Sequence, residues 1–219
     1  NLFMDKTSYF LAIGSENGIR TTEFIEPVGE SVFSVDYYTN YQFHENDDYN
    51  LAKIGRRWFG DRFDFENVKS FSFDFDNLLV DKPVSLKISA AATSEIVTSM
   101  SVELNGSPLS TMIFGPIGDP ILATGDNYSS NIDLDSSTAN LLLTYNNNGN
   151  PASSAYLDYI SIEASSALNF SEGQLTFYNK DLDLDSEIVN YEISNASNIS
   201  NIWNISNISN ISEISPNQE

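Results

Sequence analysis

The stretch FSFDFDNLLV (residues 71–80) begins with a strict alternation of apolar and polar side chains. Phenylalanine occupies the odd positions from 71 to 75, and serine or aspartate occupies the even positions from 72 to 76. Successive side chains of an extended chain point to opposite faces, so this pattern predicts a strand with one buried and one solvated face. The same period recurs in SVFSVDYY (31–38), VSLKISAAA (84–92), TSMSVELNG (98–106), ANLLLTYNN (139–147), AYLDYISIEA (155–164) and GQLTFYNKDLDLD (173–185).

Turn-forming sequences separate these stretches: SENG (15–18), LNGSP (104–108), NNNGNP (146–151) and SEG (171–173). No window shows a convincing period of 3.6, so we expect strands rather than helices. Several strands at short, regular spacing predict an all-β fold, an antiparallel β-sandwich of the jelly-roll type.

The composition changes near Asn190, after which isoleucine recurs at every third position from Ile199 to Ile214. A period of three fits neither a strand nor a helix. We therefore expect a β-sandwich domain over residues 1–189. Residues 190–219 are expected to form an extended Asn/Ile/Ser-rich segment that leads toward a downstream domain.

The charge of the chain argues against two classes of partner. Its 31 acidic and 10 basic side chains give a formal net charge of −21. Such a charge opposes binding to the phosphates of nucleic acid and to anionic membrane surfaces. No stretch approaches the roughly 20 consecutive apolar residues of a membrane-spanning helix. We expect neither a nucleic-acid partner nor a membrane span.

The chemistry available for catalysis is limited. The sequence has no cysteine and one histidine, His44, so thiol nucleophiles are excluded and a Ser-His-Asp site would have to use that histidine. We expect His44 to be a hydrogen-bonded structural residue, and we predict no catalytic and no cofactor-binding residue. Nothing singles out a glycosidase pair among the clustered carboxylates, which are Glu45, Asp47, Asp48, Asp61 and Asp64.

DLDLDSEIVNYE (181–192) is a weak candidate calcium site. Four acidic residues stand at positions one, three, five and twelve of an EF-hand spacing: Asp181, Asp183, Asp185 and Glu192. Ser186 stands where that loop needs glycine, and no flanking helix is predicted. The alternation of leucine with aspartate equally predicts a strand with one solvated face.

The segment GRRWFGDRF (55–63) concentrates three arginines, a tryptophan and two phenylalanines in an acidic chain. Its candidate ligand-binding or structural residues are Arg56, Arg57, Trp58, Asp61 and Arg62. An exposed tryptophan beside arginine and aspartate could stack on a sugar ring, whereas a buried one would anchor the sandwich. Clustered arginines in an acidic chain more often close internal ion pairs, so the structural interpretation is favoured.

The structural interpretation makes specific predictions. Gly55 and Gly60 should occupy tight backbone positions. Trp58 and Phe63 should point inward. Arg56, Arg57 or Arg62 should pair with a nearby carboxylate, Asp47, Asp48, Asp61 or Asp64.

Several stretches, in order, resemble the N-terminal non-catalytic region of PorU-like sortases of the type IX secretion system, which belong to the gingipain-type cysteine peptidases. ENDDYNLAKIGRRWFGDRFDF (45–65) is similar to the part of that region where a Glu-Asp-Asn cluster leads into Gly-Arg-x-Trp-Phe-Gly-Glu. The other similar stretches are NLFMDKTSYFLAIGSENGIR (1–20), SMSVELNGSPL (99–109), YLDYISIEASSAL (156–168) and ISNIWNIS (199–206). Asn204 and Ser206 depart from the pattern, which more often has Asp and Thr there.

The resemblance implies a place at the outer membrane surface or outside the cell. PorU-like proteins of Bacteroidetes remove the C-terminal signal from secreted cargo and join the cargo to an anionic lipopolysaccharide. Their catalytic Cys-His pair lies downstream, so this cysteine-free chain would be a non-catalytic accessory domain. The implied partners are the downstream peptidase domain, secretion subunits, cargo C-terminal signals and lipopolysaccharide glycan.

The residues leave a second hypothesis open, in which the chain is a carbohydrate-binding module of a surface protein. Jelly-roll sandwiches often bind glycans through exposed aromatic side chains. The exposure of Trp58 and Trp203 separates the two hypotheses. Buried rings favour the structural domain, and exposed rings favour the glycan-binding module.

Overall fold

The computed structural model describes residues 14, 18, 20–31, 33–51, 57–182 and 188–215. These residues form β-strands and one short 3₁₀ turn, η1 (Ala196–Asn198), so the predicted all-β class is confirmed. The chain divides into two compact units. Residues 37–168 and 176–181 form the larger, called here the sandwich unit, and residues 1–36, 169–175 and 182–219 form the smaller, called here the short-strand unit.

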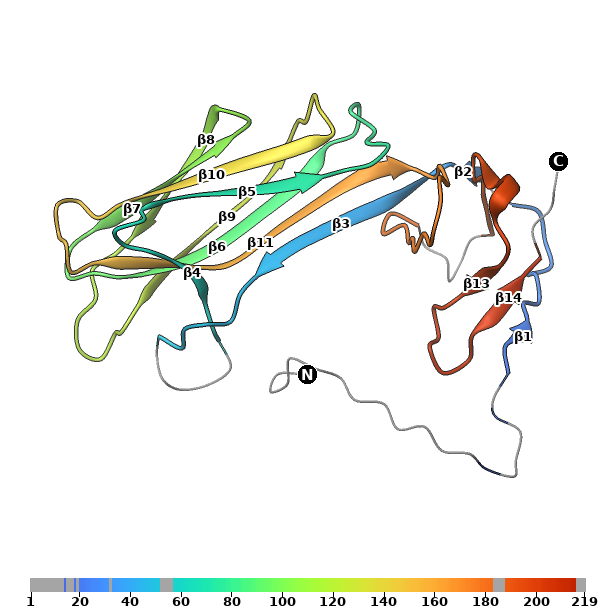
Figure 1. Cartoon of the computed structure of the whole chain (residues 1–219), viewed down its shortest axis with the longest axis horizontal. Helices are drawn as coiled ribbons and strands as arrows, with labels where there is room; N and C mark the ends of the chain where they lie inside the picture. Colours follow the sequence, from blue (N-terminus) through green and yellow to red (C-terminus); the bar gives the residue numbers. More distant parts are fainter. Residues whose placement is uncertain are drawn as a thin grey trace. The chain divides into compact units, whose positions relative to one another are not determined.

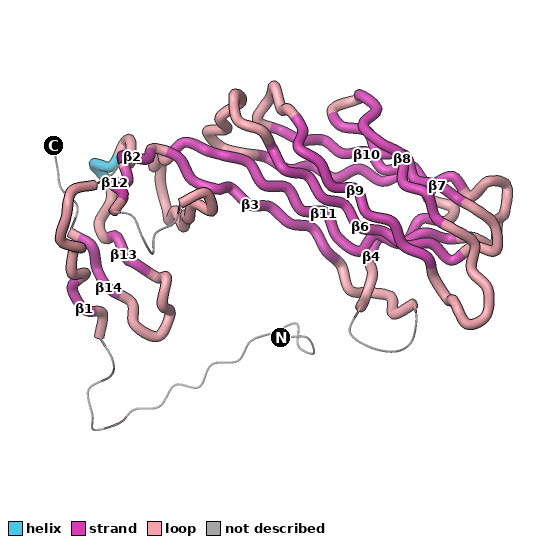
Figure 2. Tube along the Cα trace, turned by 180° about the vertical axis from the view of Figure 1, so that it is seen from behind, coloured by secondary structure: helices cyan, strands magenta, loops and turns pink. Residues whose placement is uncertain are grey.

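The sandwich unit consists of two antiparallel sheets, which confirms the predicted β-sandwich (Figure 1). The first sheet has the order β5 (Val68–Asp74), β10 (Thr138–Asn146), β7 (Thr98–Leu104) and β8 (Ser107–Phe114). The second, seen from behind in Figure 2, has the order β3 (Tyr37–Glu45), β11 (Ser154–Ala167), β6 (Val84–Thr93) and β9 (Thr124–Ile132). The short strand β4 (Gly60–Phe63) also pairs with β11.

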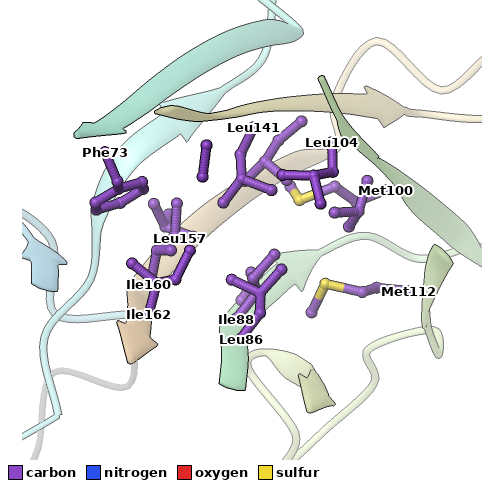
Figure 3. Packing of buried hydrophobic residues seen from close by; sticks show 14 of the residues in the cluster. Phe73, Leu86, Ile88, Met100, Leu104, Met112, Leu141, Leu157, Ile160 and Ile162 are labelled. Carbon is purple, nitrogen blue, oxygen red and sulfur yellow. The ribbon is translucent and has the colours of Figure 1, made fainter. Parts of the chain in front are cut away.

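The alternating side chains of both sheets meet in one core (Figure 3). Phe73 and Phe75 of the opening stretch are buried there, while Ser72 and Asp74 between them are exposed. The second sheet contributes Leu86, Ile88, Leu157, Ile160 and Ile162, all buried. We call this side of the second sheet its core face and the opposite side its outer face.

The predicted turn LNGSP (104–108) connects two strands as expected, whereas SENG (15–18) lies largely outside the described residues. Asn105 and Gly106 join β7 to β8, with φ angles of 49° and 80°. A two-residue hairpin turn with positive φ at both positions matches the twist of the flanking strands, and Asn-Gly adopts it readily. Residues at these two positions need that left-handed freedom.

The short-strand unit joins residues that are distant in sequence. β1 (Thr22–Glu23) pairs with β14 (Ser212–Ile214), β14 pairs with β13 (Ile202–Asn204), and β2 (Phe33–Val35) pairs with β12 (Val189–Tyr191). The structure thus groups the described residues after 190 with those before 37, whereas the sequence pattern divided the chain once, after residue 189. Pairing between such distant segments leaves no local periodicity to read. That residues 190–219 lead toward a further domain stays a prediction.

The stretch in which isoleucine recurs at every third position contains repeated turns made by Asn side chains rather than one extended segment. The Asn204 side-chain oxygen accepts from Ser206 N at 3.0 Å, and Asn207 repeats this arrangement with Ser209 N at 3.0 Å. Such Asx turns compete with regular ladders and break the segment into short strands. In the part of the chain that the structure describes, no helix has the length and apolar character needed to cross a membrane.

Candidate functional site

The described part of the GRRWFGDRF segment crosses onto the outer face of the second sheet. Phe59 exchanges backbone hydrogen bonds with Tyr49, at 2.7 and 2.9 Å. The Phe59 ring packs with Ala91 and Tyr156 in a small cluster separate from the main core, with Leu51 against it. The segment therefore covers one end of the outer face.

Two predictions for this segment concern the backbone position of Gly60 and the inward direction of the Phe63 side chain. A Cβ atom on Gly60 would overlap the side chain of Asn46 and lie 2.5 Å from its carbonyl oxygen, so the tight position is confirmed. Phe63 is fully buried in the main core, as expected. Gly55 and Arg56 lie outside the described residues, so what was expected of them stays a prediction.

The prediction that Trp58 points inward is wrong, because the residue is 42% exposed. Its neighbour Phe59 is only 5% exposed and fills the inward position. Adjacent residues of an extended segment point to opposite sides, so only one of the two rings can be buried here. In the short-strand unit, Trp203 is 54% exposed.

Arg57 binds a carboxylate that the sequence pattern did not suggest. Its Nη2 and Nε atoms lie 2.7 and 3.2 Å from Oδ2 of Asp158, and Nη2 also donates to Ser89 Oγ at 3.1 Å. Ser89 donates to the same carboxylate oxygen at 2.9 Å. Asp158 is the extra residue at a bulge of β11, between Leu157 and Tyr159. A bulge reorients a side chain in this way, and single-sequence patterns do not reveal it.

Arg62 has one of the predicted carboxylate partners, whereas Asp61 bonds residues other than the arginines of the segment. Arg62 pairs with Asp64, one of the predicted carboxylates, with its Nε 3.1 Å from Oδ2. Asp61 instead bonds His44, whose Nε2 lies 2.6 Å from Oδ2, and accepts from Asn46 Nδ2 at 3.1 Å. His44 is thus hydrogen-bonded, as expected. These bonds hold Asp61 at a φ of 37°, a left-handed conformation that non-glycine residues rarely adopt.

Two of the four residues of the calcium candidate, Asp183 and Asp185, lie outside the described residues. The backbone N–H of Asp181 donates to Asn179 Oδ1 at 3.0 Å, and that of Glu192 donates to the Val35 carbonyl at 2.9 Å. Among the residues that are described, no three His, Cys, Asp or Glu side chains gather as a metal site would require. The calcium set stays a prediction.

Three aromatic side chains that the sequence pattern did not single out stand together on the outer face. Tyr41 and Phe43 of β3 are 45% and 44% exposed, and Tyr159 of β11 is half-buried. The Tyr41 and Phe43 ring centroids are 6.0 Å apart, and those of Phe43 and Tyr159 are 5.6 Å apart. In both pairs the ring planes are inclined by 22°. We call these residues the aromatic row.

The sequence contained a signal for this row, the alternation of Tyr41 and Phe43 with polar residues. Alternation identifies a shared face, and the ordinary expectation places the aromatic face inward. In β3 the aromatic residues lie outward. Their register partners on β11 are Glu163 and Ser161, whereas His44 and Gln42 stand opposite the core residues Ile160 and Ile162.

A pocket of about 220 Å³ adjoins the row at Glu163, the register partner of Tyr41. We call it the lysine pocket. Its polar lining includes Thr39, Lys82, Ser85, Asn131, Glu163 and Lys180. Lys180 bonds the Glu163 carboxylate, and Lys82 Nζ lies 3.9 Å from the centroid of the Tyr37 ring. Two of the ten basic residues of the chain therefore meet here.

Burial and neighbouring charged groups raise three pKa values on this face. Burial, followed by the Glu163 charge, raises the pKa of the Tyr41 hydroxyl. The hydrogen bond to Glu163 raises the pKa of Lys180. Burial, and then the charges of Asp47 and Asp158, raise the pKa of Glu45. At neutral pH Tyr41 thus keeps its hydroxyl proton and Lys180 keeps its positive charge.

No protein-family model matches the sequence, and no curated protein matches it. Among solved structures, the chain is similar to dimeric latent PorU from Porphyromonas gingivalis, with a TM-score of 0.76 and 15% identity. The match covers 91% of this chain and 19% of that one, so this chain spans about a fifth of its length. At this identity the match establishes a shared fold.

Weaker matches include carbohydrate-binding modules. One is a CBM36 module in complex with calcium and xylotriose, with a TM-score of 0.36, 15% identity, and coverage of 58% of this chain and 99% of that one. Another is the CBM36-1 domain of a xylanase from the hindgut metagenome of Trinervitermes trinervoides, with a TM-score of 0.38 and 13% identity. It covers 62% of this chain and 100% of that one.

Proposed function

We propose that this chain is a non-catalytic accessory domain of a cell-surface PorU-like peptidase that processes type IX secretion cargo. The observation that carries the proposal is the correspondence of fold with PorU over 91% of the chain. The ordered resemblance of five sequence stretches to the same region supports it independently. Because the chain has no cysteine, it cannot supply the nucleophile of a cysteine peptidase.

The proposed partners follow from the same correspondence. They are a downstream peptidase domain, and with it secretion subunits, cargo C-terminal signals or lipopolysaccharide glycan at the outer membrane surface. The net charge of −21 favours the neutral or basic partners among these and disfavours the anionic lipopolysaccharide.

The coding sequence after residue 219 tests this proposal directly. We expect it to encode a domain with a gingipain-like Cys-His pair. That domain, expressed as a separate polypeptide, should bind the present chain in isothermal titration calorimetry. A stop codon or an unrelated domain at that position would contradict the proposal.

Carbohydrate binding is a second candidate function, favoured by exposed aromatic side chains. Trp58 and Trp203 are both about half exposed, and the aromatic row adds two further exposed rings. Exposed rings of this kind cover the apolar faces of sugars, while polar neighbours bond the hydroxyl edges. Binding of the purified chain to a microarray of neutral and acidic oligosaccharides tests this function.

A further inference from the structure

We infer that the aromatic row and the lysine pocket together form the binding surface for a neutral oligosaccharide. This inference rests on carbohydrate binding, the second proposed function, and assigns it to a site. The site lies within the sandwich unit, on the outer face of β3 and β11. It includes neither of the two tryptophans that the sequence had suggested.

The orientation of β3 is the first argument. Placing Tyr41 and Phe43 in solvent forgoes the burial of two large apolar surfaces, each of which would stabilise the fold in the core. The same strand places polar side chains on its core face, opposite Ile160 and Ile162. A place where the usual pattern of buried and exposed side chains is broken is expected to be a functional or a strained site.

The geometry of the row suits a chain of sugar rings. The two centroid separations, 6.0 and 5.6 Å, are comparable to the length of one pyranose unit. A sugar ring has an apolar C–H face that gains dispersion and hydrophobic contact against an aromatic side chain. Consecutive units of an extended oligosaccharide can therefore contact consecutive members of the row.

The lysine pocket supplies polar groups that can bind the hydroxyl groups of a sugar. A sugar hydroxyl both donates and accepts, so it needs donors and acceptors at close quarters. The Lys180 ammonium donates, the Glu163 carboxylate accepts, and the Asn131 amide does both. Because Glu163 also stands opposite Tyr41 in the sheet, one sugar can contact the ring and the pocket together.

Charge decides in favour of a neutral ligand. In the pocket, the two lysines are balanced by Glu163 and Asp181, and Arg57 on the same face is bound to Asp158. Lys87, across from Ser161 on the same face, is a single exposed cation and does not form a cluster that would hold a carboxylate, sulfate or phosphate. The chain as a whole, with its net charge of −21, repels anions.

Phe43 and Phe65 provide a matched pair of variants. Both phenylalanines are exposed residues of the sandwich unit, but Phe65 lies outside the row and is 99% exposed. On a neutral oligosaccharide selected by the microarray, calorimetry should show that Phe43→Ala lowers affinity about tenfold or more. Phe65→Ala should leave affinity unchanged, and Lys180→Met should lower it as well. Circular dichroism and thermal melting verify that each variant is folded.

Each other outcome overturns a defined part of the inference. If the unmodified chain binds no glycan on the array, carbohydrate binding itself is refuted. If it binds neutral glycans but Trp58→Ala or Trp203→Ala abolishes binding while Phe43→Ala does not, the function stands and the site is wrong. If it prefers acidic glycans, the charge argument fails, and the lipopolysaccharide partner gains support.

Discussion

The two faces of the second sheet carry different kinds of side chain, although the same strands form both. On the core face, β6 and β11 present aliphatic side chains that are almost completely buried, such as Ile88 and Ile160. On the outer face, the same strands present Ser89, Lys87 and Tyr159. Packing against the first sheet thus determines the side chains of one face, while the other face is free to carry polar groups and exposed rings.

At the edge strand β3, even the core face differs from the centre of the sheet. Asn40 Nδ2 donates to Ser166 Oγ at 3.1 Å, and Gln42 Nε2 donates to the Asp74 carbonyl. The His44 ring lies 4.8 Å from that of Phe71, centroid to centroid. Each inward polar side chain thus has a partner, and satisfied polar groups are tolerated near a core. This tolerance allows the aromatic side chains of β3 to face outward.

The largest effect is expected when one side chain is truncated on the core face of the second sheet and one on its outer face. Ile160→Ala should lower the free energy of unfolding by about 2–5 kcal/mol, because it leaves a cavity between the sheets. Phe43→Ala should lower it by less, roughly 0.5–1.5 kcal/mol, because the ring is 44% exposed and the change removes mainly its contacts with the Tyr41 and Tyr159 rings. Urea denaturation measures both. Equal losses would mean that the outer face is as firmly packed as the core.

Gly60 tests how the polypeptide crosses from β3 onto the outer face. Gly60→Ala should cost about 1–3 kcal/mol, because the new methyl group overlaps Asn46 and the backbone must shift. Gly118→Ala is the matched control, since a Cβ atom there meets no atom within 4 Å. Thermal unfolding compares the two variants. A neutral Gly60→Ala would show that the crossing can relax.

Asp158 tests whether the polar centre of the outer face stabilises the fold. Asp158→Asn should cost about 1–2 kcal/mol, because the charge that binds Arg57 and Ser89 is lost from a nearly buried position. Asp64→Asn, which removes the charge of a more exposed carboxylate that pairs with Arg62, should cost about 0–1 kcal/mol. Chemical denaturation of both variants, measured side by side, provides the comparison. The reverse order of losses would contradict it.

Replacing Glu45 should have the smallest effect on the free energy of unfolding, and this effect should depend on pH. Its pKa is raised above the ordinary 4.5, first by burial and then by the charges of Asp47 and Asp158. Folding therefore favours the protonated form, and the ionised form costs stability above the raised pKa. Glu45→Gln should raise the free energy of unfolding at pH 7 by roughly a few tenths of a kcal/mol. The gain should vanish as the pH falls below 4.5, and a constant gain across this range would refute the explanation.

The fold was largely predictable because alternation is a local property. The phenylalanines at 71, 73 and 75 indicated a half-buried strand, and the Asn105-Gly106 turn indicated a hairpin. The short-strand unit was not predictable in this way. Its strands are two or three residues long and pair across most of the chain, as β1 does with β14.

The candidate site was predictable only in part. The GRRWFGDRF segment does carry ion pairs, and Phe63 and Gly60 behave as its composition indicated. The partner of Arg57 was missed because Asp158 lies 101 residues away and at a bulge. Trp58 was misjudged because two adjacent rings competed for one inward position, and sequence alone gave no reason to prefer Phe59.

The all-β class, the Asn105-Gly106 turn, the lack of a cysteine nucleophile and the acidic charge were all predictable, because they follow from residue type and local spacing. The folded structure was needed to show which face of β3 is buried, and therefore that Tyr41 and Phe43 meet Tyr159 on the outer face. A period of two defines two faces without saying which one packs against the other sheet. That choice depends on contacts between strands far apart in sequence.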